Sequence, residues 1–249
     1  MNIVVDNLLI RYAQSGKGKV VVLLHGWGDN LSGLASMQQQ LSKNYQVVSL
    51  DLPGFGSSQA PTAVWNLDNY AAFLQDFLAK TGISAYAVIG HSNGGALAIR
   101  AIALGLVKPQ KLILLAASGI RAKHTFRRLL LKIIAKTGNV ATIWLPKSVR
   151  AKLRTKLYGV AGSDMLVVEQ LKDTFKATVR QDVQADAAKL TVPTLLIYAQ
   201  NDKAVPVTDG LIYKRLIKNS RLQIINDASH FVHLDKPHEV TALIEEFLK

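Results

Sequence analysis

The sequence predicts an α/β protein, a doubly wound and mostly parallel eight-stranded sheet with an inserted helical cap. Three observations support this class. Short, continuous apolar runs recur along the 249 residues, as expected for strands buried on both faces of a parallel sheet. Segments with helical periodicity separate most of these runs. The alternation then stops for a long stretch that looks helical throughout.

The first two strands are expected to form an antiparallel hairpin. Ile3–Val5 and Leu8–Ile10 flank Asp6 and Asn7, which tolerate the positive φ of a tight turn. The remaining strands are predicted at Val20–Leu24, Gln46–Leu50, Ala85–Ile89, Lys111–Ala116, Thr194–Ala199 and Leu222–Asn226.

Three helices are predicted between and after these strands. Leu67–Thr81 has apolar residues along one helical face and ends before Gly82, a typical C-terminal stop. Ala96–Leu104 is apolar on most sides, as a helix packed on a sheet is, and Glu239–Leu248 is a short amphipathic closing helix.

The domain prediction follows from the break in the alternation. Residues 1–120 and 190–249 are expected to form the α/β core, and residues 121–189 a helical cap inserted between the sixth and seventh strands. Two apolar stripes support the helices of the cap: Phe126, Leu129, Leu130, Ile133 and Ile134, and then Leu166, Val167, Leu171 and Phe175.

The net charge of +13 is concentrated in the predicted cap. Residues 121–156 carry eleven Lys and Arg residues and no Asp or Glu. These charges fit a solvated helix face, a region that attracts an anionic substrate, or weak association with an anionic membrane surface. Nucleic-acid binding is not expected, because no aromatic–basic platform or recognition motif accompanies the charge.

The composition gives a cytoplasmic protein as the default. The chain has no cysteine, no signal-peptide pattern and no apolar run of the length that a membrane-spanning helix needs. No metal or other cofactor is expected. The chain is expected to be a monomer or a homodimer.

The residues with the clearest chemical meaning lie in Gly90-His91-Ser92-Asn93-Gly94. This segment connects a predicted strand to a predicted helix through a tight turn, which would expose the Ser92 hydroxyl. The amide of Asn93, first into the helix, would stabilise an oxyanion formed there. Ser92 is therefore the candidate nucleophile.

A serine nucleophile needs a histidine base and an orienting carboxylate. His230 and Asp202 are favoured, because each lies in a loop directly after a late strand, where loops of this architecture converge on the site. Among the other histidines, His91 would point away from the site, and His233 and His238 are expected at the surface.

Two rival carboxylates are weaker candidates. Asp227 lies only three residues before His230, on the same loop. Asp51 is expected to shape the turn at Pro53–Gly56 instead.

With these motifs the chain resembles the α/β-hydrolase superfamily over nearly its whole length. The matching segments are His25–Gly28, Asp51–Ser58, Gly90–Gly95, Asn201–Pro206 and Ala228–Phe231. The resemblance implies a Ser92, Asp202 and His230 triad, with the backbone amides of Trp27 and Asn93 as the oxyanion hole. Ser229 stands where relatives usually have glycine.

The expected activity is hydrolysis of a carboxylic ester with a small or medium acyl group, by a carboxylesterase-like serine enzyme. Trp27, Phe126, Leu130, Trp144 and Phe231 are candidate substrate-binding residues. The alternatives are a meta-cleavage-type carbon–carbon bond hydrolase, a lipase or monoacylglycerol lipase-like enzyme, and a non-catalytic ligand-binding member of the fold. Serine at position 92 argues against relatives that use aspartate there, such as haloalkane dehalogenases.

Overall fold

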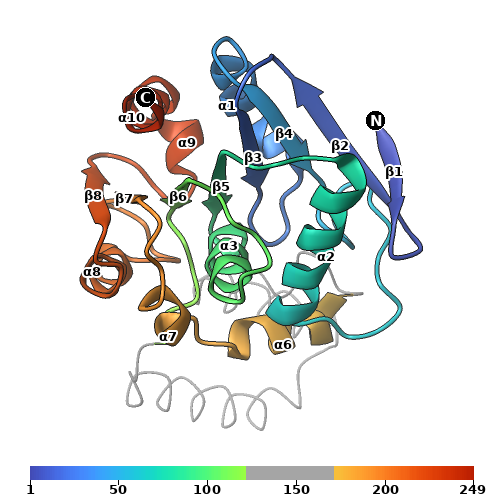
Figure 1. Ribbon diagram of the computed structural model, residues 1–249. Coiled ribbons are helices and arrows are strands. Elements are labelled where there is room, and N and C mark those ends of the chain that lie inside the picture. Colours follow the sequence, from blue (N-terminus) through green and yellow to red (C-terminus); the bar gives the residue numbers. More distant parts are fainter. Residues whose placement is uncertain (122–170) are drawn as a thin grey trace, which may run out of the picture.

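The computed structural model describes residues 1–121 and 171–249, in which helices cover both faces of a central sheet (Figure 1). Within these residues the sheet has eight strands in the order β1-β2-β4-β3-β5-β6-β7-β8. β1 and β2 pair antiparallel, as do β2 and β4, and the other neighbours pair parallel. The predicted fold class is confirmed.

The strands are β1 (Asn2–Val5), β2 (Leu8–Ser15), β3 (Val20–Leu24), β4 (Gln46–Leu50), β5 (Ala87–His91), β6 (Lys111–Leu115), β7 (Thr194–Ala199) and β8 (Ser220–Ile225). The helices are η1 (Leu31–Leu34), α1 (Ala35–Leu41), α2 (Leu67–Thr81), α3 (Asn93–Ala103), α6 (Lys172–Arg180), α7 (Gln184–Ala187), α8 (Val207–Leu216), α9 (Val232–Asp235) and α10 (Pro237–Leu248). β5 begins two residues later than predicted and ends at His91, so Ser92 follows it directly.

Local sequence signals explain two of these boundaries. Asp6 and Asn7 adopt φ values of 49° and 62° and form the tight turn between β1 and β2. α2 has its predicted bounds because Asn66 and Asn69 form a reciprocal capping box at its start and Gly82, with φ of 67°, ends it.

The alternation of side chains along the strands divides the core into two layers. In β3, Val22 and Leu24 belong to the cluster that includes buried residues of α2 and α3. Val21 and Leu23 point to the other face and join buried residues of α1 and α10. Strands buried on both faces in this way account for the continuous apolar runs.

The chain leaves and re-enters the core at one narrow neck. The amide of Val183 donates to the Gly119 carbonyl at 3.0 Å, and the amide of Arg121 donates to Oδ2 of Asp182 at 2.8 Å. Most of the segment predicted as a cap, residues 121–189, lies between these points; α6 is a described helix within them, and α7 follows Val183. The first apolar stripe of the predicted cap, with Phe126, lies outside the described residues.

An ion-pair network attaches this returning chain to the core helices. Arg100 of α3 donates to Asp68 of α2 at 2.5 Å and to the two carboxylate oxygens of Asp186 in α7 at 3.0 and 2.9 Å. Gln181 donates to the other oxygen of Asp68 at 3.2 Å. The side chain of Asp186 is only 6% exposed, so Arg100 neutralises a nearly buried carboxylate.

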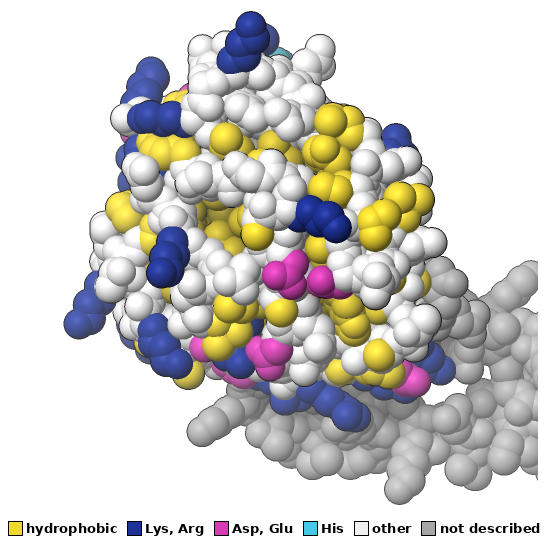
Figure 2. Space-filling view, turned by 45° about the vertical axis from the view of Figure 1, so that its right-hand side comes forward, with side chains coloured by type: hydrophobic (Ala, Val, Ile, Leu, Met, Phe, Trp, Pro, Cys, Tyr) yellow, Lys and Arg dark blue, Asp and Glu magenta, His cyan; other side chains and the backbone are white. Residues whose placement is uncertain are grey.

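The described core is only mildly basic. Ten of the 30 Lys and Arg residues and two of the 17 Asp and Glu residues lie at positions 122–170. On the face that Figure 2 shows, the Lys and Arg side chains are dispersed and do not form one patch. Within the described ranges, each helix is too short or too polar to cross a bilayer.

Candidate active site

Ser92 occupies a strained turn between β5 and α3. Its φ of 50° and ψ of −115° are unfavourable for a residue with a side chain, and its amide is held by the Leu115 carbonyl at 2.9 Å. The tight turn places the hydroxyl at the carboxyl end of the strand. Strain of this kind persists only where the surroundings fix the backbone.

The flanking glycines are required because backbones pass close to the turn. A Cβ at Gly94 would lie 2.4 Å from the Leu24 carbonyl oxygen, and one at Gly90 would lie 2.5 Å from the Gly94 carbonyl oxygen. Both distances are far below van der Waals contact. The sequence signal Gly-x-Ser-x-Gly thus has a direct steric cause here.

The structure brings together the three side chains that the sequence predicted as a triad. Nε2 of His230 lies 3.0 Å from Oγ of Ser92, and Nδ1 of His230 lies 2.7 Å from Oδ2 of Asp202. An ionised carboxylate accepts the Nδ1 proton, which leaves the lone pair of Nε2 facing the hydroxyl. In this geometry His230 can take the proton of Ser92.

Asp202 is held by its own loop. Its Oδ1 accepts hydrogen bonds from the amides of Ala204 at 2.7 Å and Val205 at 2.9 Å. Its side chain has no exposed surface, whereas that of His230 is 16% exposed. The carboxylate is therefore fixed in the orientation that His230 requires.

The backbone amides of Trp27 and Asn93 lie on the two segments beside Ser92. Asn93 is the first residue of α3, and the first amides of a helix have no partner within the helix. Trp27 follows Gly26, where a Cβ would lie 3.2 Å from Cβ of Ser92. The loop after β3 therefore runs directly past the nucleophile.

His25 and Asp51 are buried polar residues that hold the loops after β3 and β4. Nδ1 of His25 donates to the Gly26 carbonyl at 2.7 Å, and Nε2 of His25 accepts from the Leu52 amide at 3.0 Å. Complete burial lowers the pKa of His25, so its ring stays neutral.

Asp51 has the turn-forming role that was predicted for it. Its two carboxylate oxygens accept from the amides of Leu31 at 2.7 Å and Ser57 at 2.8 Å. The loop that contains Pro53–Gly56 is thereby fixed beside the site.

The rings of Phe55 and Phe175 pack against Trp27. The Trp27 ring packs edge-on against Phe55, with centroids 4.8 Å apart, and against Phe175 of α6 at 5.0 Å. Leu171 fills the space that a Cβ at Gly54 would need. Leu171 and Phe175 belong to a stripe predicted for the cap and were not among the candidate site residues, although that stripe was the available signal.

Of the other candidate substrate-binding residues, one is described by the structure. Phe231 is 43% exposed and its ring lies 5.5 Å from that of His230, at the rim of the site. Phe126, Leu130 and Trp144 lie outside the described residues.

The expectation that His233 is a surface residue was wrong. Its side chain is buried against the His91 ring, at a centroid distance of 4.7 Å. This contact joins the end of β5 to α9 and is not visible in the local sequence. Burial lowers the pKa of His233. His238 is exposed, as expected, and so is Asp227, the rival carboxylate, which occupies a turn with φ of 51°.

Ser229, the departure from the usual glycine, fixes the loop of His230. Its amide and hydroxyl both donate to Oδ2 of Asp235, at 2.7 and 2.6 Å. These hydrogen bonds lower the pKa of Asp235. The serine side chain therefore adds one hydrogen bond that a glycine could not make.

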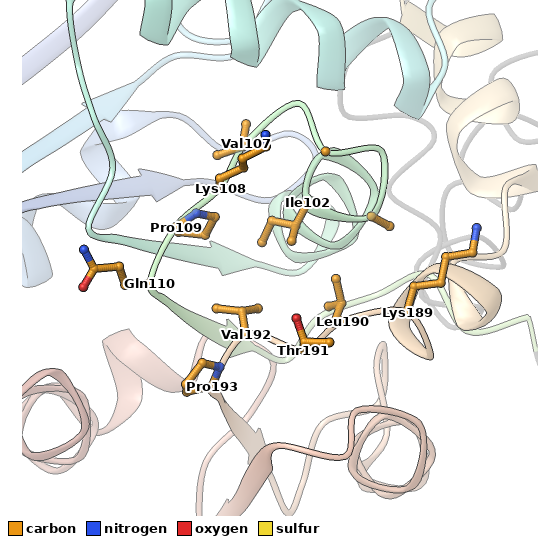
Figure 3. A pocket seen from close by; sticks show the side chains of 12 residues that line it. Ile102, Val107, Lys108, Pro109, Gln110, Lys189, Leu190, Thr191, Val192 and Pro193 are labelled. Atoms are coloured by element: carbon orange, nitrogen blue, oxygen red, sulfur yellow. The ribbon is translucent and has the colours of Figure 1, made fainter.

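A cavity of about 380 Å³ lies away from these residues (Figure 3). The segments that precede β6 and β7 line it, with Lys108, Pro109 and Gln110 on one side and Thr191, Val192 and Pro193 on the other. It is therefore at the amino ends of the strands, whereas Ser92, Asp202 and His230 follow carboxyl ends. Within residues 1–121 and 171–249, no three His, Asp or Glu side chains form a metal-binding group.

This fold agrees with the comparisons to known proteins. Residues 19–237 match the family model of the alpha/beta hydrolase fold, and the chain belongs to this family. A 2-hydroxy-6-oxo-2,4-heptadienoate hydrolase from Pseudomonas putida is 24% identical over 94% of this chain and 90% of its own length.

Two solved structures are similar over the whole length. A bacterial membrane phospholipase A is 25% identical, with a TM-score of 0.78 over 100% of this chain and 84% of that chain. An esterase from Exiguobacterium antarcticum is 19% identical, with a TM-score of 0.78 over 99% of this chain and 98% of that chain. The family and the relative from Pseudomonas putida support a hydrolase.

Proposed function

We propose that the protein hydrolyses carboxylic esters with a small or medium acyl group, through an acyl-enzyme on Ser92. The observation that carries the proposal is the continuous hydrogen-bonded chain from Ser92 through His230 to Asp202, with separations of 3.0 and 2.7 Å. Serine hydroxyls are poor nucleophiles without such a base.

The first half of the reaction forms the acyl-enzyme. Oγ of Ser92 attacks the ester carbonyl carbon while its proton passes to Nε2 of His230. The tetrahedral intermediate then collapses, and the alcohol leaves with that proton. Asp202 stabilises the imidazolium throughout, because its carboxylate accepts the Nδ1 proton and stays ionised.

The second half returns the enzyme to its starting state. A water molecule gives a proton to Nε2 of His230 and attacks the acyl carbonyl. Collapse of the second tetrahedral intermediate releases the acid and returns the proton to Ser92. In both halves the amides of Trp27 and Asn93 are proposed to stabilise the oxyanion, a contribution typically worth about 10²–10³ in turnover for one donor.

The aromatic side chains near the site favour an apolar acyl group. Trp27 and Phe55, which are buried, and the partly exposed Phe175 form a connected aromatic cluster at the loop of the proposed oxyanion donor, and Phe231 adds an exposed ring beside His230. Aromatic surfaces of this kind bind apolar groups by excluding water. We therefore expect a small-molecule ester as the substrate.

A carbon–carbon bond hydrolase is the second candidate. The relative from Pseudomonas putida is a hydrolase of 2-hydroxy-6-oxo-2,4-heptadienoate, an anionic vinylogous diketone, and it matches 94% of this chain. A panel that contains p-nitrophenyl acetate, p-nitrophenyl butyrate and that diketone distinguishes the two. The first proposal requires kcat/KM for an ester to exceed that for the diketone.

The nucleophile is tested with Ser92→Ala. We expect loss of p-nitrophenyl acetate turnover and of fluorophosphonate labelling, with the fold retained by circular dichroism. Ser42→Ala is the matched control, because the Ser42 hydroxyl only donates to the Gln39 carbonyl in a turn after α1. Turnover that survives in Ser92→Ala would exclude the acyl-enzyme on this residue.

A further inference from the structure

The imidazole of His91 lies where the loops of the candidate active site meet. His91 is the last residue of β5, and its side chain is 1% exposed. Nε2 of His91 lies 3.0 Å from the backbone carbonyl oxygen of His230, which can only accept, so the ring donates. One imidazole thus connects the segment of the nucleophile to the loop of the proposed base.

The same ring also contacts the loop after β3. A Cβ at Gly26 would lie 3.0 Å from Nδ1 of His91, so the Gly26 backbone packs directly on the imidazole. Gly26 precedes Trp27, whose amide is a proposed oxyanion donor. Three separate segments are therefore positioned against one rigid, planar group.

The protonation state of His91 follows from these contacts. Nε2 carries the proton, and the buried Nδ1 has no hydrogen-bond partner among the described residues. Burial lowers the pKa of His91 well below its usual value, and the neighbouring histidines, His233, His230 and His25, lower it further. His91 thus remains neutral while His230 is protonated during the reaction.

We propose that His91 is a positioning residue, which holds the backbone of His230 and the Gly26–Trp27 loop in register with Ser92. It does not touch the substrate and transfers no proton. The proposal rests on the proposed function, because it concerns the geometry of that site. If His91 has this role, replacing it should lower kcat and leave KM unaffected.

The test compares His91→Met with His91→Gln. Methionine keeps the apolar volume but removes the donor, whereas the glutamine amide can donate from a similar position. Loss of one neutral hydrogen bond predicts a fall in kcat of about three- to tenfold for His91→Met. KM should stay within about twofold, and His91→Gln should recover most of kcat.

His233→Met is the matched control. His233 is also a buried histidine and packs edge-on against the His91 ring, but no hydrogen bond joins it to His230 among the described residues. We expect its kcat to stay near that of the wild type. Rates are divided by the concentration of sites that fluorophosphonate titrates, which removes differences in the folded fraction.

The outcomes separate the two proposals. A wild type that fluorophosphonate does not label overturns the proposed function. A labelled wild type together with a full kcat per site in His91→Met, or an equal loss in His91→Gln, overturns the role of His91 alone. A measurement on the wild type completes the test: nitrogen NMR should show His91 as the Nε2–H tautomer at neutral pH, and the Nδ1–H tautomer would contradict the proposal.

Discussion

Oδ2 of Asp202 lies 2.7 Å from Nδ1 of His230, while Oδ1 of the same carboxylate accepts two backbone amides of its own loop. Asp202 is therefore attached both to the scaffold and to the proposed base. Because Oδ1 is held by the loop and Oδ2 faces Nδ1, Asp202 determines both the tautomer and the position of His230.

Asp202→Asn should abolish most of the activity without unfolding the protein. An amide at this position no longer enforces the productive tautomer, and such a change lowers kcat by about 10⁴ in a well-studied serine protease triad. Ester hydrolysis per folded site measures the effect. Asp227→Asn is the control, because Asp227 is exposed in a turn and asparagine tolerates its positive φ; a comparable loss there would make Asp227 the acid.

Gly94→Ala should destabilise the turn that carries Ser92. The added methyl group would lie 2.4 Å from the Leu24 carbonyl oxygen, so β3 or α3 must move. Overpacking of this kind typically costs about 1–3 kcal/mol in the free energy of unfolding, and labelling of Ser92 should slow. Urea denaturation checks the first effect. Gly82→Ala, where nothing lies within 4 Å, isolates the cost of a positive φ, and its labelling should be normal.

Arg100→Met should weaken the attachment of the returning chain. Among the described residues, it leaves the nearly buried Asp186 with only a distant cation, Lys189 at 3.8 Å. Leaving a buried acceptor unsatisfied costs about 1–3 kcal/mol. Arg221→Met provides the comparison, since Arg221 pairs with the exposed Glu246 and such pairs contribute less than about 1 kcal/mol. Equal changes in the urea midpoint would contradict this ranking.

The stability of the protein should fall as the pH drops below about 6.5. Burial lowers the pKa of His25, His91 and His233 in the folded state. Below this pH the unfolded chain binds protons that the folded chain does not bind. Each such histidine therefore lowers the free energy of unfolding by up to about 1.4 kcal/mol per pH unit.

Urea unfolding at pH 7.5, 6.5 and 5.5 measures this slope. His233→Phe should flatten this slope, because it removes one histidine whose pKa is lowered by burial in the folded protein. A slope that is the same in wild type and His233→Phe would show that His233 is protonated in the folded protein.

Much of this architecture could be predicted because it depends on local sequence. The apolar run of β3 and the glycines around Ser92 report burial and close approach directly. Asp202 and His230 could be placed because each follows a late strand. α1 and α8 have no counterpart among the predicted helices.

What could not be predicted depends on contacts between distant segments. His233 is buried because α9 packs it on His91, and Phe175 lies on Trp27 because α6 crosses the loop after β3. The apolar stripe that contains Phe175 indicates that its ring packs against apolar surface but not which loop it contacts, and no local pattern indicates the burial of His233.

The neck between Gly119 and Val183 has a consequence for how such a protein can diversify. Because the chain departs and returns at two hydrogen-bonded residues, a segment of different length can be grafted there without disturbing the strand order. Ser92, His230 and Asp202 all come from outside that graft. The proposed catalytic residues and the segment between Gly119 and Val183 therefore occupy separate stretches of the chain, and transplanting that segment from a relative tests whether it changes substrate preference while the chemistry is kept.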